Sequence, residues 1–211
     1  AFGSLYAAHK EAGEEAVMLT ARLIADDLAQ LGINVNCAPV LDSFCDGAAD
    51  IIGDRAYDTD ADTVARLGRK VCEGLLNGGV LPVIKHIPGH GRASVDSHIE
   101  LPVVDTCLET LRQTDFAAFR LLADAPLAMT AHVIYSKIDP HNPATVSKSV
   151  IADIVRGDIG FDGLLLSDDL SMKALTGTMR ERTAAAITAG CDVVLHCNGN
   201  MDEMSAVAEA C

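Results

Sequence analysis

Aromatic residues are scarce in this sequence. Phe, Tyr and Trp make up 4% of the 211 residues, and there is no Trp. Large aromatic side chains supply the flat, rigid faces on which many ligands stack. The sequence therefore argues against a binding platform built from stacked aromatic rings.

Basic residues and long apolar runs are also lacking. There are 16 Lys and Arg residues against 30 Asp and Glu residues, which gives a net charge of −14. Such a charge disfavours nucleic acids and anionic membrane surfaces as partners. No apolar run approaches the ~18 residues of a transmembrane helix, and the start shows no signal-peptide pattern. We expect no nucleic-acid partner and no membrane partner.

The cysteines lack the spacing of a metal or redox motif. There are seven, an odd number, and none forms a C-x-x-C pair. Several lie within apolar helix or strand patterns. Reduced, mostly buried thiols are typical of proteins in a reducing compartment, so we predict a cytoplasmic location.

Apolar residues form 49% of the chain, and they alternate between strand and helix patterns. There is no hairpin signal, linker or repeat, so we predict a single α/β domain over residues 1–211 with a parallel sheet. Two T-x-x-E capping boxes, at Thr106 with Glu109 and at Thr178 with Glu181, mark helix starts. The predicted helices cover 4–31, 61–77, 106–123, 148–156, 178–189 and the residues from 200 on. The predicted strands cover 33–41, 81–84, 127–131, 164–166 and 191–195.

Every predicted strand ends on polar side chains. In a (β/α)₈ barrel the active site is built at the carboxyl ends of the strands. Five strands are too few to close such a barrel, so either the sheet is open and doubly wound, or about three strands precede Ala1. No Gly-rich nucleotide fingerprint follows any strand, which counts against the doubly wound nucleotide-binding fold. The polar strand ends are Asp42, Lys85 with His86, His132, Asp168 with Asp169, and His196 with Asn198.

One stretch, Lys85 to His98, is unusually rich in titratable groups. It reads K-H-I-P-G-H-G-R-A-S-V-D-S-H and follows a short apolar strand. Gly89, Gly91 and the small residues near them predict a mobile loop that delivers His98 by closure. A loop with so few apolar residues is not designed for packing, so we interpret it as part of a site.

Two groups of candidate residues could carry out acid–base or nucleophilic chemistry. Asp96 could orient the imidazole of His98 and make it a general acid/base, or both could be solvated loop residues. Asp168 ends an apolar strand and could serve as a nucleophile or stabilise a cation. Asp168 could equally be an N-cap, a role that Asp169 fits as well.

Basic side chains near the strand ends are candidates for binding a ligand. Lys85 and His86 close a strand and could donate hydrogen bonds to substrate hydroxyls, although His86 could also be a satisfied core histidine. Arg55 lies in a polar loop beside Gly53 and Asp54, where it is either a fixed donor to a ligand or a loop salt bridge.

A metal site is the competing interpretation of the histidine-rich stretch. Pro88 and Gly89 separate its first two histidines, so H-x-x-x-H cannot lie on one face of a helix. We therefore predict no metal and no cofactor. The residues that could form a cluster are His86, His90, Asp96, His98 and Asp168.

With these residues identified, the chain resembles glycoside hydrolase family 3, and within it the bacterial β-N-acetylhexosaminidases of peptidoglycan recycling. The most specific signature is K-H-x-P-G-H-G followed by D-S-H, in which Ile87 replaces the usual Phe. The matching stretches are A-P-V-L-D at 38–42, I-G-D-R-A-Y at 52–57, K-H-I-P-G-H-G at 85–91, D-S-H at 96–98, A-H-V-I-Y-S at 131–136 and G-F-D-G-L-L-L-S-D-D-L-S-M at 160–172.

The resemblance implies a TIM-type (β/α)₈ barrel of which this chain carries strands four to eight. It implies a retaining hydrolysis of terminal β-linked N-acetylglucosamine from muropeptides that contain anhydro-N-acetylmuramic acid. A family 3 β-glucosidase and a catalytically silent sugar-binding remnant stay open as alternatives. By motif match, the resemblance assigns the nucleophile to Asp168, the acid/base to His98, its partner to Asp96, and sugar binding to Arg55, Lys85 and His86.

Overall fold

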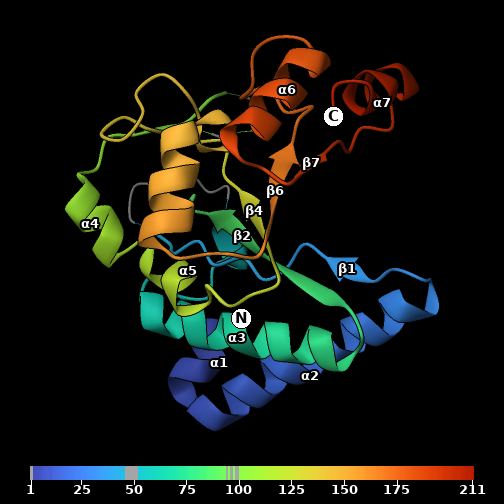
Figure 1. Cartoon of the computed structure of the whole chain (residues 1–211). Helices are drawn as coiled ribbons and strands as arrows, with labels where there is room; N and C mark the ends of the chain where they lie inside the picture. The colour runs from blue at the N-terminus through green and yellow to red at the C-terminus, as the bar shows by residue number, and fades with distance from the viewer. Residues whose placement is uncertain (1, 46–51, 94, 96, 98–99) are drawn as a thin grey trace.

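The computed structural model describes residues 2–45, 52–93, 95, 97 and 100–211. Its centre is a parallel sheet of five strands (Figure 1). The strands pair in the order in which they follow one another along the chain, without a reversal. A doubly wound sheet would reverse its order at a switch point, so this sheet is the five-strand portion of a barrel. The strands are β1 (Val35–Asn36), β2 (Leu81–Ile87), β4 (Leu127–Thr130), β6 (Leu164–Asp169) and β7 (Val193–Leu195).

A small second sheet was not predicted. It consists of β3 (Val103–Val104) and β5 (Ile134–Tyr135), which pair in parallel. The first predicted strand is shorter than expected, because pairing is confined to β1 and to one further bridge between Val40 and Lys85. Pro39 lies between these two contacts, and proline has no N–H to donate to a ladder.

The amino-terminal helices lie together beside the sheet (Figure 1). The predicted helix at 4–31 is two helices, α1 (Phe2–Ala8) and α2 (Lys10–Gln30), which meet at His9. Helix α2 packs along α3 (Ala61–Asn77), whose predicted bounds are confirmed. The close approach depends on Gly74, where a Cβ atom would lie 2.4 Å from the carbonyl oxygen of Met18.

The predicted helix at 106–123 is wrong in two respects. It is divided into α4 (Leu108–Gln113) and α5 (Ala117–Leu121), and Cys107 is the N-cap without a capping side-chain bond. The break lies at Thr114 and the buried Asp115. Asp115 accepts a 2.6 Å hydrogen bond from Nε of Arg92, on the segment after β2. This tertiary ion pair directs the chain inward where local sequence favours a continuous helix.

The remaining helices follow the prediction more closely. Helix α6 (Met179–Ala189) begins with the predicted capping box of Thr178 and Glu181, and α7 (Met201–Ala208) begins after Asn200. The helix predicted at 148–156 is a π-helix, η3 (Val150–Asp158). The described residues also form two 3₁₀ turns, η1 (Gly53–Arg55) and η2 (Ala144–Val146). None of the helices in the described ranges combines the length and apolarity needed to cross a membrane.

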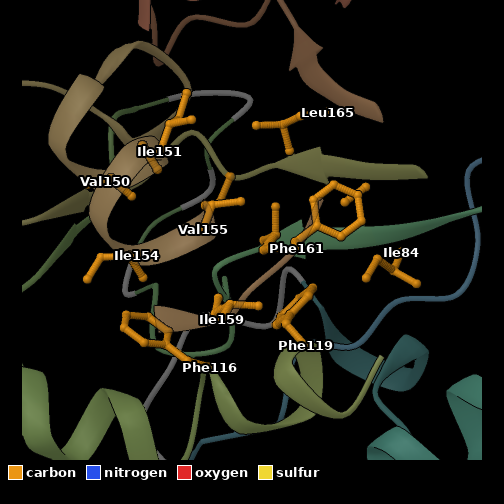
Figure 2. Packing of buried hydrophobic residues seen from close by; sticks show 14 of the residues in the cluster. Ile84, Phe116, Phe119, Val150, Ile151, Ile154, Val155, Ile159, Phe161 and Leu165 are labelled. Atoms are coloured by element: carbon orange, nitrogen blue, oxygen red, sulfur yellow. The ribbon is translucent and has the colours of Figure 1, made fainter. Parts of the chain in front are cut away.

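The two faces of the sheet have different surroundings. The main core packs η3 and α5 against one face, with Phe116, Phe119 and Phe161 among its largest side chains (Figure 2). Ile84 and Leu165 point into this core. Because side chains alternate along a strand, Val83 and Leu166 point to the other face, where they form a smaller cluster with Leu127 and Met129. The same alternation places Lys85 and Asp168 on that second face.

Candidate active site

The polar carboxyl ends of β2 and β6 meet around one small cavity of about 120 Å³. The predicted candidates Arg55, Lys85, His86 and Asp168 all contribute to it. They come from η1, β2 and β6, so segments far apart in sequence supply one site. The residues that line the cavity are Ile52, Arg55, Lys85, His86, His90, Ser97 and Asp168.

A buried carboxylate organises the β2 side of the cavity. Asp42 has no exposed surface and accepts hydrogen bonds from His86 Nδ1 (2.7 Å) and from the backbone N–H of His90 (2.6 Å). The backbone N–H of His86 lies 3.3 Å from both carboxylate oxygens. Burial alone would raise the pKa of Asp42. The charges and hydrogen bonds of His86 and His90 outweigh burial and hold this pKa below its usual value.

The Asp42 bond fixes the protonation pattern of His86. A carboxylate only accepts hydrogen bonds, so Nδ1 of His86 carries a proton. Within the described residues Nε2 makes no hydrogen bond, which leaves it for a ligand in the cavity. The prediction left open whether His86 is a satisfied core histidine or a ligand donor. In the structure one ring nitrogen is satisfied in the core and the residue lines the cavity, while donation to a ligand stays a prediction.

His90 is the second buried histidine of the site. Its Nε2 lies 3.1 Å from Oγ of Ser97, and its Nδ1 has no hydrogen-bond partner in the described part of the chain. Burial, partly opposed by the charge of Asp42, lowers the pKa of His90. The imidazole is therefore neutral at pH 7. Sequence analysis considered His90 only as a metal ligand and did not anticipate its contacts with Asp42 and Ser97.

The structure separates the two adjacent carboxylates at the end of β6. Asp169 accepts hydrogen bonds from the backbone N–H and the hydroxyl of Ser171, and from the backbone N–H of Cys197. It therefore serves the turn, as an N-cap would. Asp168 lines the cavity and accepts only the backbone N–H of Asp169, at 2.8 Å, within the described residues. Of the two residues, Asp168 is the one that lines the cavity.

The glycines after β2 are required for close packing. A Cβ atom at Gly91 would lie 1.9 Å from the carbonyl oxygen of Ser43, and one at Gly89 would lie 2.9 Å from Cβ of Asp115. Gly89 also has a φ of +143°, in the region that favours glycine. Sequence analysis attributed both glycines to loop mobility, whereas in the structure they allow tight contacts.

Asp96 and His98 lie outside the described residues. Their predicted pairing, the closure of their loop and the position of His98 relative to Asp168 stay predictions. Ser97, between them in sequence, is buried and contacts His90. Among the residues that the structure describes, no group of three or more His, Cys, Asp or Glu side chains is arranged to hold a metal ion.

Comparison with known proteins gives the chain a family. The model of the glycosyl hydrolase family 3 N-terminal domain matches residues 2–211. A β-hexosaminidase of Thiobacillus denitrificans is 40% identical over 200 residues, which cover 93% of this chain and 55% of that protein. One from Neisseria gonorrhoeae is 39% identical over 191 residues, covering 89% of this chain and 52% of that protein. The chain thus spans about half the length of the curated relatives it matches.

Solved structures share the fold. The family 3 β-N-acetylglucosaminidase of Paenibacillus sp. FPU-7 is 36% identical with a TM-score of 0.88, over 93% of this chain and 38% of that one. NagZ of Neisseria gonorrhoeae in complex with N-trifluoroacetyl-D-glucosamine is 35% identical with a TM-score of 0.87, over 99% and 59% of the two chains. NagZ has also been solved with a zinc ion, at 34% identity and a TM-score of 0.85, with the same coverage of both chains. These matches confirm the resemblance found in the sequence: the chain belongs to glycosyl hydrolase family 3.

Proposed function

We propose that the protein carrying this chain hydrolyses terminal β-linked N-acetylglucosamine by a retaining mechanism. The observation that carries the proposal is the placement of the Asp168 carboxylate in one cavity with Arg55, Lys85 and His86. This combines a nucleophile with cationic and imidazole donors suited to sugar hydroxyls. Relatives named β-hexosaminidase, and NagZ bound to an N-acylated glucosamine, support N-acetylglucosamine as the sugar.

The proposed reaction has two steps. Asp168 attacks the anomeric carbon and forms a covalent glycosyl-enzyme, while His98, oriented by Asp96, protonates the departing oxygen. In the second step neutral His98 removes a proton from water, which attacks the anomeric carbon and releases Asp168. A histidine has an unperturbed pKa of ~6.5, so both of its forms are accessible near neutral pH.

The sugar-binding residues have a division of labour in this proposal. His86 is held from behind by Asp42, so its remaining ring nitrogen meets a sugar hydroxyl in a fixed orientation. Lys85 and Arg55 supply further donors. We propose that residues 1–211 belong to a single catalytic barrel domain, of which they supply strands four to eight. We also propose that its substrates are cytoplasmic muropeptides carrying N-acetylglucosamine on anhydro-N-acetylmuramic acid, and that no metal is required.

The test is turnover of a chromogenic N-acetylglucosaminide, with the corresponding glucoside in parallel. We expect hydrolysis of the N-acetylglucosaminide with retention of anomeric configuration, and loss of activity in Asp168→Ala. Preference for the glucoside would indicate a β-glucosidase. Binding of N-acetylglucosamine without turnover of either compound would indicate a sugar-binding protein and would refute the proposal.

A further inference from the structure

A chain of hydrogen bonds connects the end of β4 to both sides of the Asp168–Asp169 pair. The backbone N–H of Asp168 lies 3.3 Å from Oγ1 of Thr130, which in turn lies 2.8 Å from Oγ1 of Thr145. Thr145 Oγ1 lies 2.7 Å from Nδ1 of His132. The circuit closes at Nε2 of His132, 3.0 Å from the carbonyl oxygen of Asp169.

The two backbone ends fix the directions of the first and last bonds of this circuit, and the bonds between them follow for a neutral His132. The carbonyl of Asp169 only accepts, so His132 carries a proton on Nε2. A neutral His132 then accepts at Nδ1 from the hydroxyl of Thr145, and Thr145 accepts from the hydroxyl of Thr130. Thr130 accepts from the N–H of Asp168. Thr145 Oγ1 also lies 3.2 Å from the carbonyl oxygen of Ala131, so its one proton is shared between that carbonyl and Nδ1 of His132, whereas the proton on Nε2 of His132 is fixed.

The circuit is fully shielded from water. Thr130, His132 and Thr145 have no exposed surface. Burial lowers the pKa of His132, while the carboxylates of Asp168 and Asp169 oppose this effect and the nearby His86 adds to it. The outcome is a neutral imidazole, which agrees with the tautomer that the hydrogen bonds require. None of the three side chains lines the cavity, so they do not touch a ligand there.

We propose that Thr130, Thr145 and His132 are positioning residues that hold the nucleophile Asp168 in its attacking orientation. They hold the backbone N–H of Asp168 and the backbone carbonyl of Asp169, which leaves the carboxyl end of β6 little freedom to rotate. This inference rests on the proposed function, because it assumes that Asp168 is the nucleophile. A misplacement of about 1 Å in a catalytic group can lower a rate by ~10²-fold.

Thr145→Val is the most informative variant. Valine has nearly the same shape, but it removes the hydroxyl that joins Thr130 to His132. We expect kcat for an N-acetylglucosaminide to fall by about 10- to 100-fold with KM changed by less than about threefold, because the sugar-binding side chains are untouched. Thr145→Ser retains the hydroxyl and should restore kcat to within about threefold of the unmodified protein.

Thr183→Val is a matched control. Thr183 is likewise fully buried and donates through Oγ1 to the carbonyl of Met179 at 2.8 Å, within helix α6. It should lose a comparable amount of thermal stability and keep its kcat. If Thr183→Val lowers kcat as much as Thr145→Val does, the effect is a general cost of burying valine, and the proposal is overturned.

Thr130→Val interrupts the same circuit from its other end and should lower kcat in the same way. It provides the decisive measurement if Thr145→Val does not fold. Unchanged kcat in a folded Thr145→Val or Thr130→Val protein refutes positioning while leaving the proposed hydrolysis intact. Absence of turnover in the unmodified protein refutes the proposed hydrolysis and this inference with it.

Discussion

Replacement of Asp42 by asparagine tests the hydrogen bonds that hold His86, which we propose to bind sugar. In the structure this carboxylate receives the His86 ring at 2.7 Å and the His90 backbone N–H at 2.6 Å, without any exposure to solvent. An asparagine oxygen could keep the bond to His90. Its amide nitrogen would then face Nδ1 of His86, and that imidazole would have to shift its proton to Nε2 to accept the new bond.

The expected cost follows from what each variant loses. Asp42→Asn replaces the charge-assisted bond from His86 Nδ1 by a neutral bond, which should lower the unfolding free energy by about 2 kcal/mol. Asp42→Ala removes this acceptor from three buried donors, the ring Nδ1–H of His86 and the backbone N–H groups of His86 and His90, which should lower the unfolding free energy by about 4 kcal/mol. Asp105→Asn is the control, because Asp105 pairs at the surface with Lys137 at 2.9 Å. That change should leave the free energy of unfolding nearly unchanged, because solvent screens this exposed pair.

Urea denaturation of the three variants at neutral pH measures these differences. The difference in unfolding free energy between the unmodified protein and Asp42→Asn should become smaller at acidic pH. The folded pKa of Asp42 lies below its ordinary value, so the carboxylate stabilises the protein above that value and loses this contribution as pH falls through the folded pKa. In activity assays KM should rise more than kcat falls. If Asp42→Asn and the unmodified protein have the same unfolding free energy at every pH, the proposed contribution of the Asp42 hydrogen bonds is refuted.

Four further outcomes are expected. Asp168→Ala should abolish turnover with the fold intact, and Asp169→Ala should cost less activity; the reverse ranking would identify the wrong carboxylate as the nucleophile. His98→Ala should slow substrates with poor leaving groups more than activated phenols, and equal slowing of both would exclude it as the acid. EDTA should leave turnover intact, whereas loss that zinc restores would indicate a metal enzyme. The folded pKa values of His90 and His132 lie below the ordinary histidine value, so the unfolded state binds more protons as the pH falls. Each histidine should therefore lower the unfolding free energy by up to about 1.4 kcal/mol between about pH 7.5 and about pH 5.5. Urea denaturation of the unmodified protein and of the two Gln variants measures this loss.

The location of the site could be predicted from sequence because of a geometric rule. Parallel strands end at a common edge, so polar residues that follow each strand must meet there. Lys85 and Asp168 were placed together in this way although they lie on different strands. Periodicity alone left the order of pairing open, because it identifies strands but carries no information about which strands are neighbours. The family resemblance implied a barrel, and the chain-ordered pairing in the structure confirms it.

Other features depend on contacts that local sequence does not encode. The break between α4 and α5 lies where Asp115 pairs with Arg92, a contact between segments that are far apart in the sequence. The T-x-x-E pattern of Thr106 and Glu109 is common in sequences, and it predicted neither the true N-cap nor this break. The role of Asp42 depends on His86, 44 residues later in the chain. Thr130 and Thr145 were missed altogether, since a threonine in an apolar strand or a short turn has no pattern that signals a hydrogen-bond circuit.

The chain-ordered pairing of strands has a consequence for how the protein folds. Each strand adds to the one before it, so assembly can proceed by adding one strand and helix at a time, with only one loop closure for each addition. The cavity, however, needs β2, β4 and β6 to be paired together. A partly assembled sheet holds Lys85 and His86 on β2 and Asp168 on a β6 that is not yet docked. Ligand binding therefore reports on the late steps of assembly, and a ligand selects for molecules that have completed them.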